Sequence, residues 1–212
     1  MHTKTAGSVL HGAARYDLTV WLFTLGRERI FREKVVRLAR LKAGESVLDV
    51  GSGTGTLAIA AKRLVEPQGT VHGIDASPEM IARARKKAMK TGVEVVFENA
   101  VAEALPFPDS QFDVVLTSMM LHHLPRKARQ QCACEMRRVL KPGGRVLAVD
   151  FGGTAPERRS LLEHFHHRHG HVKLHDLVAL LTEAGLHVVE SGQVGIRDLQ
   201  FVLASAPERS ET

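Results

Sequence analysis

The residues whose types and spacing could do chemistry cluster first in a glycine-rich stretch, residues 47–55. It reads Val-Leu-Asp-Val-Gly-Ser-Gly-Thr-Gly, and a small-residue helical run begins at once with Thr56. Glycines at alternate positions leave the turn without side chains, so backbone N–H groups can approach a ligand closely. About 20 residues later the apolar run 71–74 ends in Asp75, and a carboxylate at that distance suits a ribose hydroxyl pair. The pattern predicts a nucleoside-bearing cofactor.

The chemistry around this turn does not suit a phosphate. Thr56 stands where the dinucleotide fingerprint has its third glycine, and no Gly-Lys-Ser/Thr sequence marks a phosphate-binding loop. No lysine or arginine lies between Lys42 and Lys62, and Asp49 would repel a phosphate but receive a cation. S-adenosylmethionine meets these conditions, because it offers a ribose to Asp75 and an ammonium group to Asp49. A generic Rossmann-like turn that binds NAD, or nothing, is the alternative.

The chain resembles the class I S-adenosylmethionine-dependent methyltransferases (methyltransferase type 11), in the branch similar to quinone C-methyltransferases and small phospholipid N-methyltransferases. The resemblance covers roughly residues 40–151 and rests on an ordered set of motifs, at 47–55, 73–80, 102–108, 112–115, 121–124 and 138–145. It implies a Rossmann-like, doubly wound α/β sheet of seven strands, mostly parallel with the last strand antiparallel beside the fifth. Helices would cover both faces, with an N-terminal helical lid.

The length of 212 residues favours a single methyltransferase domain over 1–212. We expect a lid at 1–42, the cofactor-binding core at 43–151, and a variable substrate segment with C-terminal strands at 152–212. Apolar runs and turn signals predict strands at 46–50, 70–74, 93–98, 113–117, 144–150, 187–194 and 199–204. Helices are expected near 27–41, at 55–65, 78–91, 126–139 and 176–185. The first seven residues are expected to lack fixed structure.

The expected cofactor contacts lie at the carboxyl ends of strands, where open α/β sheets bind ligands. Asp49 would orient the ammonium group, and Asp75 would accept hydrogen bonds from the ribose. The resemblance implies an aspartate for the adenine where this chain has Val101, so Asn99, Glu103 or backbone near 102 would take that role. The predicted cofactor-binding set is Asp49, Gly51, Ser52, Gly53, Gly55, Asp75, Ala76, Met80, Val101, Ala102, Ser118 and His123.

Three residues are candidates for contact with the methyl acceptor. His122 and His123 follow the fourth core strand, and histidine can take a proton near neutral pH. Tyr16 belongs to the expected lid segment. The alternatives are that the histidine pair caps the following loop and that Tyr16 packs in the core.

The remaining polar clusters predict neither a metal-binding site nor a nucleic-acid-binding surface. Six histidines lie between His164 and His175, where a substrate-lining or solvated segment is the preferred interpretation. The net charge of +6 is dispersed over helix faces, so nucleic-acid binding is not expected. Cys132 and Cys134 are predicted to be ordinary reduced thiols. A missing signal peptide and membrane span predict a cytoplasmic protein, with peripheral contact at the inner membrane face as a variant.

The function predicted from these patterns is methyl transfer from S-adenosylmethionine, by in-line displacement, to a small, apolar or lipid-like acceptor. The basic helix near 27–41, next to Trp21 and Phe23, would suit an anionic membrane surface or a lid packed on the sheet. Two alternatives stay open: a non-catalytic S-adenosylmethionine-binding sensor or assembly protein, and a methyltransferase acting on nucleic acid or protein. The sequence leaves the oligomeric state undetermined.

Overall fold

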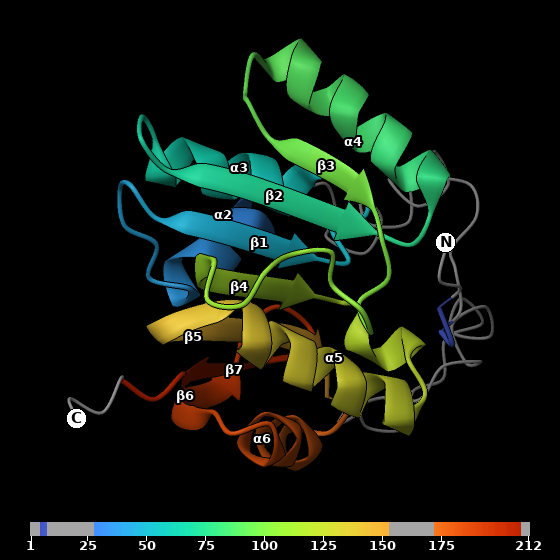
Figure 1. Cartoon of the computed structure of the whole chain (residues 1–212), viewed down its shortest axis with the longest axis vertical. Coiled ribbons are helices and arrows are strands. Elements are labelled where there is room, and N and C mark those ends of the chain that lie inside the picture. Colours follow the sequence, from blue (N-terminus) through green and yellow to red (C-terminus); the bar gives the residue numbers. More distant parts are fainter. Residues whose placement is uncertain (1–4, 8–27, 153–171, 209–212) are drawn as a thin grey trace.

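The described part of the computed structural model, residues 5–7, 28–152 and 172–208, is built around one seven-stranded sheet (Figure 1). Its strand order is β3-β2-β1-β4-β5-β7-β6. The first five strands pair in parallel, while β7 is antiparallel to both β5 and β6. This confirms the predicted doubly wound fold with its last strand antiparallel. The strands are β1 Ser46–Val50, β2 Thr70–Asp75, β3 Val96–Asn99, β4 Phe112–Ser118, β5 Leu140–Phe151, β6 His187–Gln193 and β7 Leu199–Ser205.

Helices cover both faces of the sheet because its central strands are buried on both sides. In β1, Val47 packs with the helices of one face and its neighbour Leu48 with those of the other, as the two-residue period of a strand requires. The first face carries α2 Glu28–Leu38, α3 Thr56–Val65 and α4 Pro78–Thr91. The second carries α5 Arg126–Val139 and α6 Leu174–Glu183, and a short 3-10 turn, η1 Leu121–His123, follows β4.

The glycine turn between β1 and α3 packs against an aromatic side chain of β3. Gly55 has φ +79°, and a Cβ added there would lie 2.6 Å from Phe97 Cζ. A Cβ on Gly73 of β2 would lie 2.7 Å from Phe97 Cδ1. The two glycines therefore make room for Phe97, which is 2% exposed, and this packing fixes the turn against the sheet.

The start of α4 follows the expected capping pattern. Ser77 Oγ accepts a hydrogen bond from the Met80 backbone N–H at 3.4 Å, and Pro78 occupies the first helical position. Gly92 ends the helix at φ +65°. These signals are local in the sequence, which is why the predicted bounds 78–91 are correct.

Several predicted strand boundaries differ from the structure by one residue, and the starts of β3 and β5 differ by more. β3 begins at Val96 and not at 93, because the Val93 N–H donates to the Ala88 carbonyl and so completes the end of α4. β5 begins at Leu140 and not at 144, because Leu140 pairs with Phe112 ahead of an irregularity in the ladder. The expected turn at 141–144 is therefore part of β5.

The predicted lid is only partly described by the structure. α2 buries Phe31 and Val35 in the same hydrophobic cluster as α3, so its apolar stripe packs on the sheet. Trp21 and the rest of 8–27 lie outside the described residues. Within the described residues no helix has the length and apolar character needed to cross a bilayer.

The packing of Phe97 predicts unequal effects for two glycine substitutions. Gly55→Ala adds a Cβ that would lie 2.6 Å from Phe97 and 2.9 Å from Ala84, at a left-handed φ. It should lower the free energy of unfolding by about 2–4 kcal/mol. Gly44→Ala is the matched control, since Gly44 has φ +85° with no atom within 4 Å, and should cost about 1 kcal/mol. Urea denaturation measures both, and equal losses would contradict the packing argument.

Candidate functional site

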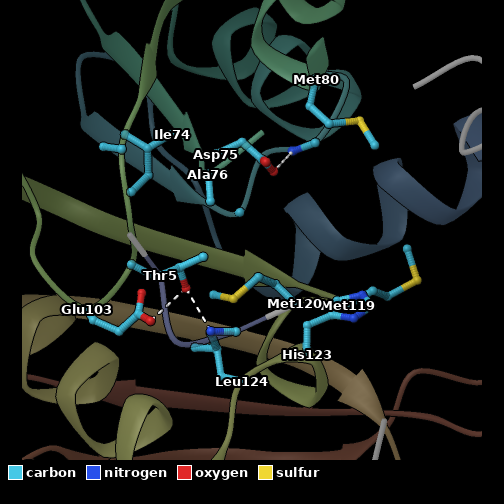
Figure 2. Close-up of a pocket in the computed structure, with 15 residues that line it drawn as sticks. Thr5, Ile74, Asp75, Ala76, Met80, Glu103, Met119, Met120, His123 and Leu124 are labelled. Atoms are coloured by element: carbon cyan, nitrogen blue, oxygen red, sulfur yellow. Dashed lines mark hydrogen bonds between the residues drawn. The ribbon is translucent and has the colours of Figure 1, made fainter. Parts of the chain in front are cut away.

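A cavity opens where β1, β2 and β4 end, between the glycine turn and the segment after β4 (Figure 2). It brings together predicted cofactor residues that lie far apart in the sequence. Among them are Gly51 and Gly53 of the turn, Asp75 at the tip of β2, and His123 after β4. The cavity is lined by Thr5, Gly7, Gly51, Gly53, Ile74, Asp75, Ala76, Met80, Ala100, Ala102, Glu103, Met119, Met120, His123 and Leu124.

Asp75 connects the glycine turn to the start of α4. Its Oδ2 accepts a hydrogen bond from Gly53 N–H at 2.9 Å, and its Oδ1 accepts one from Ser77 N–H at 2.8 Å. Burial raises the pKa of this carboxyl, and the two backbone N–H groups oppose that effect. Each carboxylate oxygen has a second lone pair, so Asp75 can also accept from two ligand hydroxyls.

Asp49 lies behind the glycine turn and is 1% exposed. Burial raises its pKa to about 7; the positive charge of Arg32 opposes this rise, and the charge of Asp75 adds to it. The Ala58 backbone N–H, in the first turn of α3, bonds to the carboxylate, but Oδ2 finds no partner among the described residues. A buried carboxylate oxygen without a donor suits a cation.

These features fit S-adenosylmethionine. Asp49 supplies negative charge for an ammonium group, Asp75 supplies acceptors for ribose hydroxyls, and the turn offers backbone without side chains. Among the described residues that line the cavity there is no lysine or arginine, which disfavours a pyrophosphate. The donor set therefore agrees with a cationic, phosphate-free nucleoside.

The structure places the other predicted cofactor residues behind the cavity wall. Ser52 and Ser118 are buried, and their hydroxyl groups have no partner among the described residues. Gly55 faces Phe97, and Val101 is buried with 8% of its surface exposed. These residues shape the wall rather than forming its surface.

Sequence reasoning missed the contact between the N-terminal segment and Glu103. Thr5 and Gly7, in a segment expected to lack fixed structure, line the cavity. Thr5 Oγ donates to Glu103 Oε1 at 2.7 Å (Figure 2). The Ala6 N–H donates to the same oxygen at 2.9 Å. Glu103, which follows the position where the expected aspartate is absent, thus anchors a segment across the cavity. Thr5 and Ala6 stand in no sequence pattern that would indicate a contact with Glu103.

The three catalytic candidates have different positions. His123 lines the cavity, while the ring of His122 bonds through Nδ1 to Asp150 Oδ1 at 2.6 Å. Tyr16 lies outside the described residues, as does most of the histidine cluster. His175, at the end of that cluster, is exposed and contacts Asp176. Within the described ranges, no group of three or more histidine, cysteine or acidic side chains could hold a metal.

The chain is similar to known methyltransferases in sequence and in structure. Residues 47–144 match a family model described as a methyltransferase domain. The ubiquinone/menaquinone biosynthesis C-methyltransferase UbiE of Yersinia enterocolitica is 35% identical over 181 residues, which cover 84% of this chain and 71% of the relative. The match with that relative extends well beyond the glycine turn.

Two solved structures extend the comparison. An S-adenosylmethionine-dependent methyltransferase from Aquifex aeolicus superposes with a TM-score of 0.74 at 23% identity, covering 92% of this chain and 99% of that one. A structure described as a putative methyltransferase from Bacillus halodurans superposes with a TM-score of 0.64 at 30% identity. The superposition covers 76% of this chain and 71% of that one. At 23% identity, the likeness to the Aquifex aeolicus structure shows a shared fold alone.

The raised pKa of Asp49 predicts pH-dependent binding of S-adenosylmethionine. Below pH 7 the carboxyl is largely neutral and cannot pair with the ammonium group, which stays protonated up to about pH 7.7. Affinity measured by calorimetry should rise about tenfold from pH 5.5 to 7 and then level. Asp49→Asn should bind weakly and independently of pH over this range.

The same variant supplies its own folding control. Folding raises the pKa of Asp49 from its ordinary value of 3.8 to about 7. Between these two pH values, ionisation of Asp49 therefore lowers the free energy of unfolding as the pH rises. Asp49→Asn should therefore melt no lower than the wild type at pH 7.5. Wild-type affinity that does not change with pH would contradict the role of Asp49.

The Glu103 contact predicts a kinetic effect on the cofactor. Glu103→Ala removes the acceptor for Thr5 and Ala6, and hydrogen bonds to charged groups contribute about 1.5–3 kcal/mol. S-adenosylmethionine should dissociate about tenfold faster in stopped-flow experiments, because one wall of the cavity loosens. Glu94→Ala, at an exposed glutamate before β3, is the control. Equal dissociation rates in both variants would show that the segment does not retain the cofactor.

Proposed function

This chain belongs to the S-adenosylmethionine-dependent methyltransferases, and we propose that its methyl acceptor is a small apolar ring compound of the quinol type. Membership in the family makes it an enzyme that uses S-adenosylmethionine. When bound, this cofactor supplies a methyl carbon activated by a positively charged sulfur, which keeps the electron pair of the broken C–S bond. The protein's own contribution is to bind and align the acceptor.

One observation carries the acceptor proposal: the cavity wall formed by the segment after β4 is apolar. Met119, Met120 and Leu124 line the same cavity as Asp75 and the glycine turn (Figure 2). Met120 packs directly over Gly51, at a position that a side chain on Gly51 would occupy. Thioether and aliphatic groups favour an apolar ring over a charged acceptor. The relative UbiE is named for C-methylation in ubiquinone and menaquinone biosynthesis, which agrees with a quinol ring.

The cofactor orientation follows from the charges of the site. We assign the ribose to Asp75, the ammonium group to Asp49, and the methionyl chain to the backbone of Gly51 and Gly53. Ala76 and Met80 would border the adenine. This orientation directs the methyl group toward the segment after β4, where the apolar side chains and His123 lie.

A membrane-surface form of the proposal finds less support. Among the described residues, the apolar stripe of α2 is packed inside, and Ile30 is its main exposed apolar side chain at 56%. We therefore assign the acceptor to the cavity and not to a lipid surface contacted by α2. Co-sedimentation with anionic vesicles distinguishes the two, and the cavity form predicts no retention.

The proposal predicts methylation of short-chain naphthoquinols and benzoquinols by the purified protein with labelled S-adenosylmethionine. Met120→Gln should raise the KM for the quinol about tenfold, because a polar amide replaces an apolar contact that the bound quinol would cover. Met89→Gln is the matched control, since Met89 is 77% exposed on α4. Label appearing only in the protein or nucleic-acid fraction of an extract would contradict the proposal.

A further inference from the structure

Asp150, at the carboxyl end of β5, is a fully buried carboxylate with three hydrogen-bond partners. Oδ1 accepts from the Phe151 backbone N–H at 2.8 Å and lies 2.6 Å from His122 Nδ1. Oδ2 accepts from the His122 backbone N–H at 3.0 Å. With a backbone donor on each oxygen, the carboxylate acts as an acceptor, so Nδ1 of His122 is the donor.

This bond determines which nitrogen of His122 can take a proton. A neutral imidazole with hydrogen on Nδ1 carries its lone pair on Nε2, at the opposite edge of the ring. The ring is held between two others: Phe151 meets it edge-on at 5.2 Å, and His123 lies 4.0 Å away between centroids. The His122 side chain is 12% exposed, so its orientation is fixed by packing as well as by Asp150.

In the pair formed with Asp150, His122 is not itself among the described residues that line the cavity, but its ring contacts that of His123, which is. His122 belongs to η1, and its neighbour His123 lines the cavity together with Met119 and Met120. β4 and β5 pair in parallel, so both members of the pair lie at the edge of the sheet where ligands bind. The cofactor residues Asp49 and Asp75 come from β1 and β2, which lie on the opposite side of β4 from β5.

From this geometry, and resting on the proposed function, we infer that His122 is the general base for the acceptor and that Asp150 is its positioning residue. The acceptor is then a compound that must lose a proton to react, such as a ring hydroxyl, and not a neutral amine or thioether. The O–H bond breaks, the proton goes to His122 Nε2, and the electron pair remains on the acceptor. That pair, on the oxygen or delocalised to a ring carbon, forms the new bond to the methyl carbon while the bond between that carbon and sulfur breaks and its electron pair stays on sulfur. Where a ring carbon forms the bond, the proton of that carbon is then lost to water, and His122 also releases its proton to water.

The arrangement has a spectroscopic consequence that is independent of turnover. Long-range 15N–1H NMR of histidine-labelled protein should show His122 as the Nδ1–H tautomer, assigned by loss of its signal in His122→Gln. Asp150→Asn places an amide N–H₂ opposite a donor and should shift His122 toward the Nε2–H tautomer. A wild-type His122 with hydrogen on Nε2 would overturn the inference.

The kinetic test uses quinols and phenols of graded acidity in single-turnover experiments. With weakly acidic hydroxyl groups, His122→Gln should lower the rate about 100-fold or more, because it removes the base. With acceptors already ionised at the working pH, the loss should shrink to a few-fold. A merely structural role would reduce both rates alike, and this outcome would overturn the inference. His187→Gln, at an exposed histidine on β6, is the control.

Failure of the inference and failure of the proposed function give different results. If wild type methylates quinols and His122→Gln does so equally fast, the base assignment is wrong while the proposed function stands. If wild type methylates no hydroxyl-bearing acceptor, the proposed function is wrong and the base assignment falls with it. S-adenosylmethionine affinity and melting temperature, measured for each variant, show whether Asp150→Asn still folds around its cofactor.

Discussion

The carboxylate of Asp75 holds two parts of the cofactor site in one arrangement, and the rest of the site depends on this interaction. It accepts from the N–H of Gly53 in the glycine turn and from the N–H of Ser77 before α4. The turn and the helix that carries Met80 are thereby tied to the tip of β2 (Figure 2). These two bonds, together with the packing of Phe97 against the turn, hold the turn and the start of α4 in place relative to a ligand.

Carboxylates lie at the carboxyl ends of β1, β2 and β5, and their hydrogen-bond partners differ in a way that separates their roles. Asp75 bonds to two backbone N–H groups and still faces the cavity. Asp150 has three hydrogen-bond partners, two backbone N–H groups and the ring of His122. Asp49 keeps one oxygen without a partner among the described residues. The ammonium group of the cofactor fits Asp49, and a role in proton transfer fits Asp150 with its histidine partner.

Local sequence signals predicted the elements well where local residues determine them. The capping residues Ser77 and Gly92 gave correct bounds for α4, whereas β5 was predicted too short because its first pair depends on Phe112, far away in the chain. Motif residues of the turn and of β2 line one cavity, and their contacts with a cofactor stay a prediction. The docking of Thr5 on Glu103 joins residues 98 positions apart, and neither residue belongs to a pattern that would indicate it. Long-range contacts of this kind have no local signature.

A crystal structure of the S-adenosylhomocysteine complex tests the central claim most directly. The account predicts ribose hydroxyls at about 2.6–3.2 Å from the Asp75 carboxylate. It also predicts the amino group beside Asp49 and the sulfur directed toward Met120 and His123. A ligand bound elsewhere, or with its ribose away from Asp75, would contradict the account.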